Sequence, residues 1–275
     1  MAGMLYLVPT PIGNLGDISQ RCRETLENAD FIAAEDTRVS LKLLNHLGIK
    51  KSLVSYYEHN KAFKGEKIVE RILAGETCAL VSDAGSPAIS DPGEDLVKLC
   101  HEAGIVVCAI PGPCAVITAR SISGQATGRV CFEGFLSTAK KSRREHLESL
   151  INEQRTMIFY EAPHKLVATL QDMAAVFGED RSISLCRELT KLHEEVVRTT
   201  LGGAIAKYSE NAPKGEFVLV VAGAPEVEKE TATADDAAVR VRQLMEEGLS
   251  RKDAIKQTAK ELNLPKNIVY DAALQ

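Results

Sequence analysis

Apolar and polar residues alternate along the first part of the chain in a pattern that predicts strands followed by helices. Short apolar, β-branched runs predict strands at 4–8, 31–34, 52–55, 77–81 and 105–110. Between them, in 39–47 and 67–73, apolar residues recur every three or four positions, and a glycine follows each run at Gly48 and Gly75. That spacing is typical of amphipathic helices with a glycine stop. Strands that alternate with such helices favour a mainly parallel sheet.

A second alternation starts after Gly124. It predicts strands at 130–133, 156–160, 182–186 and 216–221, with helices near 142–151 and 163–177. We therefore expect an α/β protein of two α/β domains, 1–120 and 121–224, with a binding cleft between them, because domain interfaces favour pockets.

The last part of the chain differs from both alternations. A charged, Thr/Ala-rich segment, 225–234, is typical of a linker. Three short helices are expected after it, at 237–247, 251–262 and 266–274, in a module that spans 235–275. Small and apolar residues in this tail have the spacing of a helix-turn-helix. Acidic and basic residues balance there, so a module that only packs against the rest is an equal alternative.

Glycine and proline are dense just after two of the predicted strands, in 82–93 and 111–115. These residues allow sharp turns and let a ligand approach the backbone closely. In a parallel sheet, the loops that follow the strands emerge at one edge, where open α/β folds bind ligands. Either turn alone is explained by a tight strand-to-helix connection. Together they predict a small-molecule site.

Composition narrows the classes of function. The 275 residues carry a net charge of −5, which excludes a basic coat over the whole protein but leaves room for a local basic patch. The seven cysteines form no Cys-x-x-Cys pair and the six histidines show no ligand spacing, so the sequence makes no case for a metal. We find neither a signal-peptide pattern nor an apolar run of membrane-spanning length, and expect a cytoplasmic protein.

Several motifs together resemble one family. They are Tyr6-Leu7-Val8-Pro9-Thr10-Pro11-Ile12-Gly13-Asn14-Leu15, Glu35-Asp36-Thr37-Arg38, residues 82–93, Pro111-Gly112-Pro113, Phe132-Glu133-Gly134-Phe135-Leu136, Tyr160-Glu161-Ala162-Pro163-His164 and Cys186-Arg187-Glu188-Leu189-Thr190-Lys191. The chain resembles the bacterial ribosomal RNA small-subunit methyltransferase I family, a branch of the tetrapyrrole-methylase-like, class III enzymes. Residues Cys114, Arg120, Ser137 and Lys165 depart from the usual pattern of that family.

The resemblance implies two α/β domains with S-adenosylmethionine between them and a homodimer. It also implies 2′-O-methylation of a decoding-centre cytidine in 16S ribosomal RNA, free or in the assembled small subunit. The expected cofactor-binding residues are Pro9, Gly85, Ser86, Pro87, Ile89, Cys114, Ala115, Tyr160, Glu216 and Phe217.

A ribose hydroxyl is a weak acid, so its methylation benefits from a general base. The candidates at the ends of the predicted strands are His59, Glu58, Asp36 and Glu35. His59 titrates nearest to neutral pH, although a lone histidine more often serves a structural hydrogen bond. Arg38 follows Asp36 by two residues, and this pair is either part of the catalytic machinery or an ion pair that shapes the loop.

The clearest basic cluster consists of Lys140, Lys141, Arg143 and Arg144. It suits contacts to RNA phosphates, which dominate affinity for nucleic acids. The alternative is a solvated helix start. For stacking on bases, the plausible aromatic residues are Tyr56, Tyr57 and Phe135.

Two other classes of function compete with this interpretation, besides a class III methyltransferase with a different substrate. A dinucleotide-dependent oxidoreductase is suggested by Gly13 and Gly16 after the first strand and Glu35 about twenty residues later, but Pro11 replaces the first glycine of that fingerprint. A non-catalytic nucleic-acid-binding factor would use the C-terminal helices, but it would not need so elaborate a ligand-binding edge.

Overall fold

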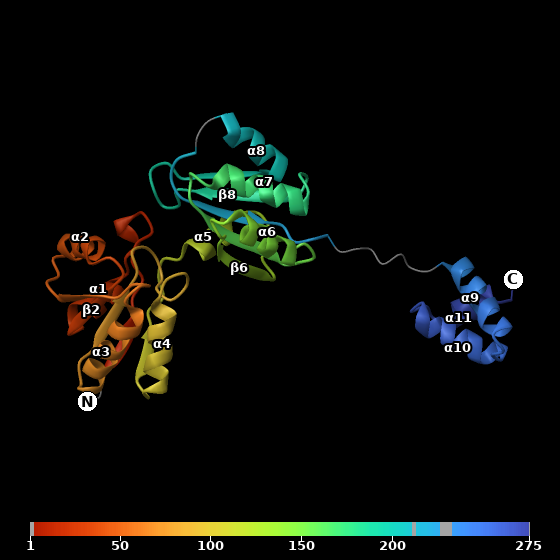
Figure 1. Cartoon of the computed structure of the whole chain (residues 1–275), viewed down its shortest axis with the longest axis horizontal. Helices are drawn as coiled ribbons and strands as arrows, with labels where there is room; N and C mark the ends of the chain where they lie inside the picture. The colour runs from red at the N-terminus through yellow and green to blue at the C-terminus, as the bar shows by residue number, and fades with distance from the viewer. Residues whose placement is uncertain (1–2, 211–212, 226–232, 275) are drawn as a thin grey trace. The chain divides into compact units, whose positions relative to one another are not determined.

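The computed structural model describes residues 3–210, 213–225 and 233–274. The chain divides into two compact units, Met1–Ala224 and Pro225–Gln275 (Figure 1). The expected boundary at 120/121 falls inside helix α5 (Ala115–Ile122), and the residues on both sides belong to the first unit. That unit nevertheless contains two separate five-stranded sheets.

The first sheet is parallel throughout, as the alternating pattern predicts. Its strands are β1 (Met4–Leu7), β2 (Phe31–Ala34), β3 (Ser52–Ser55), β4 (Cys78–Val81) and β5 (Val106–Ala109). They lie in the order β3-β2-β4-β1-β5, so β4 is central and β3 and β5 are the edges. The connecting helices are α1 (Gln20–Asn28), α2 (Thr37–Leu47), α3 (Lys61–Leu73) and α4 (Gly93–Glu102), and the 3-10 turn η1 (Leu15–Asp17) precedes α1.

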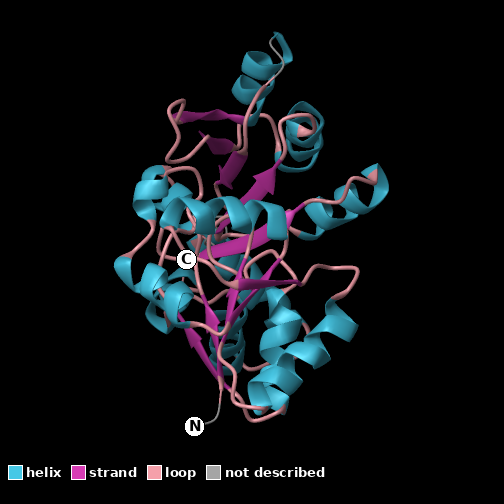
Figure 2. Cartoon of the chain, turned by 90° about the vertical axis from the view of Figure 1, so that its left-hand side faces the viewer, coloured by secondary structure: helices cyan, strands magenta, loops and turns pink. Residues whose placement is uncertain are grey.

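Helices cover both faces of this sheet, as the strands in magenta and helices in cyan of Figure 2 illustrate. Leu26 of α1 and Leu44 of α2 pack with Ile32 on one face. Ile72 of α3 and Leu96 of α4 pack with the neighbouring strand residue, Phe31, on the other. Successive strand residues point to opposite faces, so a strand covered on both sides is apolar throughout. This explains the unbroken apolar runs in the sequence.

The second sheet is mixed, and one of its strands was not expected. Its strands are β6 (Val130–Phe135), β7 (Thr156–Glu161), β8 (Ser182–Arg187), β9 (Glu195–Thr200) and β10 (Phe217–Val221), in the order β6-β7-β10-β8-β9. Only β6 and β7 are parallel; the other neighbours are antiparallel. The sequence pattern does not predict β9, because β9 is an edge strand whose residues are only partly buried or exposed.

The two faces of the second sheet are covered unequally. Helices α6 (Lys140–Ser149), α7 (Leu166–Phe177) and α8 (Leu201–Glu210) pack against one face in a large apolar core. The other face receives α5, whose Val116 and Ala119 pack on Ile158, Val218 and Val220. Helix α5 has only eight residues. It leaves one end of this face free to form the wall of a cavity.

The C-terminal unit contains α9 (Ala234–Glu246), α10 (Arg251–Glu261) and α11 (Lys266–Ala272) around an apolar core of its own. Thr233 caps α9 by accepting a hydrogen bond from the N–H of Asp236. Most of the expected linker, 226–232, lies outside the described residues. Within the described part of the chain, every helix falls short of the length and apolarity needed to cross a membrane.

Candidate active site

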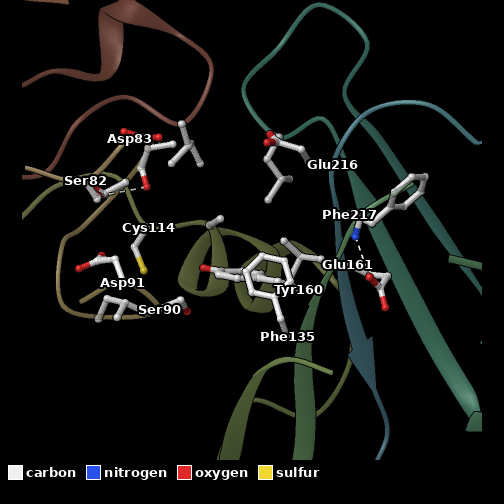
Figure 3. Close-up of a pocket in the computed structure, with 18 of the residues that line it drawn as sticks. Ser82, Asp83, Ser90, Asp91, Cys114, Phe135, Tyr160, Glu161, Glu216 and Phe217 are labelled. Carbon is white, nitrogen blue, oxygen red and sulfur yellow. Dashed lines mark hydrogen bonds between the residues drawn. The ribbon is translucent and has the colours of Figure 1, made fainter. Parts of the chain in front are cut away.

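A cavity of about 630 Å³ lies where the carboxyl ends of the first sheet face one end of the second (Figure 3). The first sheet contributes loop residues Ile12, Glu35, 82–86, 89–91, Cys114 and Ala115. The second contributes Phe135, 160–164, Cys186, Leu189 and 216–218. The strand-end loops thus meet at one edge, as the parallel arrangement predicts.

The loops on the first side are tied to one another by backbone hydrogen bonds. Thr10 and Gly85 exchange both of theirs, at N···O distances of 2.9 and 3.0 Å. The hydroxyl of Ser82 donates to the carbonyl of Gly85 at 3.2 Å, and the hydroxyl of Ser86 donates to the carbonyl of Pro113 at 2.9 Å. Loops that follow β1, β4 and β5 therefore form one connected wall.

This wall requires unusual backbone conformations. Gly85 has a φ of 86°, and a Cβ there would lie 3.2 Å from Cγ2 of Ile12. Ala88 also has a positive φ, 64°. The Asp91 carboxylate holds that turn by accepting from the N–H groups of Ala88 and Gly93. Backbone strain of this kind persists only where the surroundings enforce it, and it is frequent at functional sites.

Aromatic residues shape the second wall. The Tyr160 hydroxyl accepts a 3.2 Å hydrogen bond from the backbone N–H of Val116, at the start of α5. Burial raises the pKa of Tyr160 to about 12, so its phenol stays protonated at neutral pH. The Phe135 ring lies 5.4 Å from that of Tyr160 and is 58% exposed. The accessible ring of Phe135 therefore lies at the cavity beside the ring of Tyr160, which is held by its hydrogen bond.

Carboxylates give the cavity its charge, and most are already engaged. Asp83 accepts from the N–H of Asp36 at 3.0 Å, and Glu161 accepts from the Thr169 hydroxyl at 2.6 Å. Glu216 forms a 2.8 Å ion pair with Lys191. Glu35 is different. Burial raises the pKa of its carboxyl, and the negative charges of Asp83 and Asp91 raise it further.

The structure brings the expected cofactor-binding residues together. All of them line the cavity except Pro9 and Pro87. Pro9 instead packs closely against Gly112, where an added Cβ would lie 2.7 Å from Cβ of Pro9. Their binding role stays a prediction. The sequence interpretation did not single out Ile12, Asp83, Asp91, Leu189 and Val218, although each belongs to a quoted motif or a predicted strand.

Of the candidates for the general base, Glu35 lines the cavity. None of His59, Glu58, Asp36 and Arg38 is among the described residues that line the cavity. Glu58 forms an ion pair with Lys61 at 2.7 Å. Asp36 and Arg38 form a local ion pair at 2.6 Å, which holds the pKa of Asp36 at about 2. The geometry favours the interpretation in which this pair shapes the loop.

The basic cluster on α6 needs one correction. Arg143 is 8% exposed and its guanidinium contacts Asp172 at 2.6 Å. Its Nη1 also donates to the carbonyls of Ser137 and Thr138. Arg143 therefore anchors α6 to α7 and is not available to RNA. Lys140, Lys141 and Arg144 are exposed.

The stacking candidates also separate. Tyr56 is 1% exposed and belongs to the apolar core of the first sheet, so it cannot stack on a base. Tyr57 is exposed but does not line the cavity. Phe135 alone of the three combines exposure with a place at the cavity.

Comparison with known proteins identifies the family. A sequence model of Tetrapyrrole (Corrin/Porphyrin) Methylases matches residues 4–205. A Synechocystis protein named Ribosomal RNA small subunit methyltransferase I is 49% identical over 273 residues, which is 99% of this chain and 98% of the relative. The Haemophilus influenzae protein of that name is 46% identical over 100% of this chain and 97% of its own length.

Solved structures agree on the fold. A Thermus thermophilus uroporphyrin-III-C-methyltransferase matches with a TM-score of 0.56 and 17% identity, over 79% of this chain and 94% of its own. A cobalt precorrin-4 methyltransferase matches with a TM-score of 0.57 and 19% identity, over the same shares. The chain therefore belongs to the tetrapyrrole methylase family and, within it, to the ribosomal RNA small subunit methyltransferase I family.

Proposed function

We propose that this protein transfers a methyl group from S-adenosylmethionine to the 2′-oxygen of a decoding-centre cytidine ribose in 16S ribosomal RNA. The observation that carries the proposal is the cavity between the two sheets, in a chain whose full-length relatives are named for methylation of small-subunit ribosomal RNA. The 2′-oxygen and the cytidine come from the resemblance of the motifs, and they are the part that the experiment below must test.

The lining of the cavity suits S-adenosylmethionine. Its volume, about 630 Å³, lies in the range of small-molecule sites. Apolar side chains of Ile12, Ile89, Leu189 and Val218 fit an adenine ring. The carboxylates suit the positive sulfonium and ammonium groups, since opposite charges attract strongly in a partly dehydrated site. When bound, S-adenosylmethionine supplies an electrophilic methyl group.

The residues of this chain would act mainly by positioning. Methyl transfer needs the acceptor oxygen in line with the bond that breaks, and fixed geometry supplies a large part of the rate. The hydrogen bonds among Thr10, Gly85, Ser86 and Pro113 hold one wall in place, and the bond from Val116 to Tyr160 fixes the other to α5. A cavity tied on both sides can hold donor and acceptor in one orientation.

Phe135 is the residue that we assign to the acceptor base. Its ring is exposed at the cavity and packs, tilted, against the ring of Tyr160. RNA-binding proteins commonly stack unpaired bases on such rings. We assign Lys140, Lys141 and Arg144 to phosphate contacts. The catalytic roles of His59, Glu58, Asp36 and Arg38 remain predictions without support from the cavity.

Product mapping tests the proposal. Purified protein is incubated with labelled S-adenosylmethionine and 16S ribosomal RNA, and the product is digested and analysed by mass spectrometry. We expect one methylated cytidine that carries the label on ribose and resists alkaline cleavage. A label on the cytosine ring would overturn the 2′-O assignment. Binding of NAD in place of S-adenosylmethionine would overturn the proposal that the protein is a methyltransferase.

We further propose that the enzyme acts as a homodimer on the assembled small subunit. Exposed apolar side chains such as Leu192, which is 92% exposed and follows Lys191 in a loop near the cavity, support a protein-protein contact. Light scattering should give twice the 29.8 kDa chain mass. Parallel assays with naked 16S ribosomal RNA and with assembled subunits should show faster transfer to the subunits. A monomeric mass would contradict the homodimer. A preference for naked RNA would contradict the assembled subunit as substrate.

A further inference from the structure

We infer that Glu35, at the carboxyl end of β2, is the general base that accepts the proton of the ribose hydroxyl. The inference rests on the proposed function and assigns a residue within the same cavity. Glu35 lines the cavity and is half-buried, whereas His59 does not line it.

The strand order explains why Glu35 reaches the cavity. Strand β2 lies beside β4, whose following loop forms much of the first wall. Strand β3 is at the edge of the sheet, so the loop that carries Glu58 and His59 emerges one strand further out. A residue directly after β2 therefore lies beside the β4 loop, and Glu35 lines the cavity there.

The other titratable groups of the cavity have different tasks. Asp83 and Asp91 accept hydrogen bonds from backbone N–H groups that shape the loops, and Glu161 accepts from Thr169. Glu216 is paired with Lys191. Burial raises the pKa of Tyr160 to about 12 and that of Cys186 to about 11, so both stay protonated at neutral pH.

Glu35 remains, with His164 and the Cys114 thiol as its competitors. Among the residues that the structure describes, no Lys, Arg or His forms an ion pair with Glu35. The charged groups with the largest effect on its pKa are Asp83, Asp91 and Asp36, all acidic, and a hydrogen bond from the backbone N–H of Asp83 opposes them. A carboxylate in such surroundings binds a proton more readily than an ordinary one. His164 also lines the cavity, but it is exposed and lies two residues before α7 begins.

The proton and electron balance is complete without a further reactant. As the 2′-oxygen bonds to the methyl carbon, the carbon–sulfur bond breaks and its electron pair stays on sulfur, which becomes a neutral thioether. The hydroxyl proton passes to the ionised Glu35 carboxylate. Water then removes it after the product leaves.

The test compares Glu35→Gln with His164→Gln, Cys114→Ser and His59→Ala. Loss of a general base typically lowers turnover by about 10²- to 10⁴-fold. We expect Glu35→Gln to lower kcat by that factor, with S-adenosylmethionine affinity changed less than about threefold, which is small beside the loss in kcat. In the parent, kcat should rise with pH through the raised pKa of Glu35, because only the ionised carboxylate accepts a proton. This rise should vanish in Glu35→Gln.

A readout independent of activity is available in the free protein. A glutamate whose folded pKa exceeds the ordinary value of 4.5 costs stability as pH rises through that pKa. Glu35→Gln should therefore melt at a higher temperature than the parent at pH 7.5, and the difference should shrink below pH 4.5. Carbon-13 NMR of the side-chain carboxyls should show one signal, absent from Glu35→Gln, that titrates above the usual range.

The outcomes separate the inference from the proposed function. If the parent methylates ribose and Glu35→Gln retains the parental kcat and pH profile, the inference fails and the proposed function stands. If His164→Gln, Cys114→Ser or His59→Ala removes the pH dependence in its place, the residue replaced in that variant is the base. If the parent methylates no RNA, the proposed function fails, while the NMR titration still reports on Glu35.

Discussion

At the scale of single residues, both the backbone conformation of Gly85 and the space around it exclude a larger side chain. Its φ of 86° strains any other residue, and its Cβ position faces Ile12 in the cavity. We expect Gly85→Val to lose S-adenosylmethionine binding by calorimetry. Positive φ at a β-branched residue costs roughly 1–3 kcal/mol, so the variant should melt lower but still fold cooperatively.

Gly48 provides the matched control for this substitution. Its φ is 73°, yet nothing lies within 4 Å of the position of its Cβ. Gly48→Val should suffer a similar loss of stability and keep its affinity for the donor. Equal affinities of the two variants for S-adenosylmethionine would show that Gly85 is not part of the binding site.

Arg143 and Arg144 are neighbours in sequence with opposite tasks. The Arg143–Asp172 pair is largely buried, and removing one partner from such a pair costs about 3–5 kcal/mol. The Arg144–Glu148 pair is exposed, at 3.7 Å, and exposed pairs contribute about 0–1 kcal/mol. Urea denaturation should show Arg143→Ala to be the far more destabilising change. Similar midpoints for the two variants would mean that Arg143 is not a structural anchor.

At the scale of elements, α6 presents three exposed basic residues once Arg143 is set aside. Changing Lys140, Lys141 and Arg144 together to Gln should weaken RNA binding and flatten the plot of log affinity against log salt, because fewer counterions are released. Affinity for S-adenosylmethionine should not change. The measurement is a filter-binding titration at several salt concentrations.

A second triple variant controls for net charge. Lys42, Lys50 and Lys98 are exposed and lie on or next to helices of the first sheet. Their change to Gln removes the same charge from another surface and should leave the salt dependence as in the parent. If both triple variants behave alike, α6 is an ordinary solvated helix.

The elements also show what the sequence could predict. Strands buried on both faces, such as β2 and β4, were predicted because their residues are apolar throughout. The half-exposed edge strand β9 was missed because Glu195, Arg198 and the threonines break that pattern. Loop motifs located the cavity, but not which loops enter it. That depends on the order of strands in the sheet, which hydrophobic periodicity does not encode, and so His59 was favoured over Glu35.

At the scale of the whole molecule, the cavity is complete within the first unit. Every residue that lines it lies between Ile12 and Val218, and the C-terminal helices have a separate core. We expect a chain that ends at Ala224 to fold and to bind S-adenosylmethionine as tightly as the full chain, measured by calorimetry and thermal melting.

The same truncation separates the two interpretations of the C-terminal module. If the module packs against the first unit, its removal would expose apolar surface on that unit. The shortened chain would then melt lower or aggregate. A nucleic-acid-binding module would leave melting unchanged and weaken RNA binding only. Loss of both properties would indicate that the two units depend on each other for folding.

Cys114 gives the cavity a chemical handle. Burial raises the pKa values of Cys100, Cys131 and Cys186 to about 11, which keeps these thiols poorly nucleophilic. Cys108 and Cys114 are partly exposed, and of these two only Cys114 lines the cavity. Iodoacetamide should therefore alkylate both, while bound S-adenosylmethionine protects Cys114 and leaves Cys108 as an internal reference in the peptide mass spectrum. An electrophile built on adenosine should therefore inactivate this enzyme by alkylating Cys114.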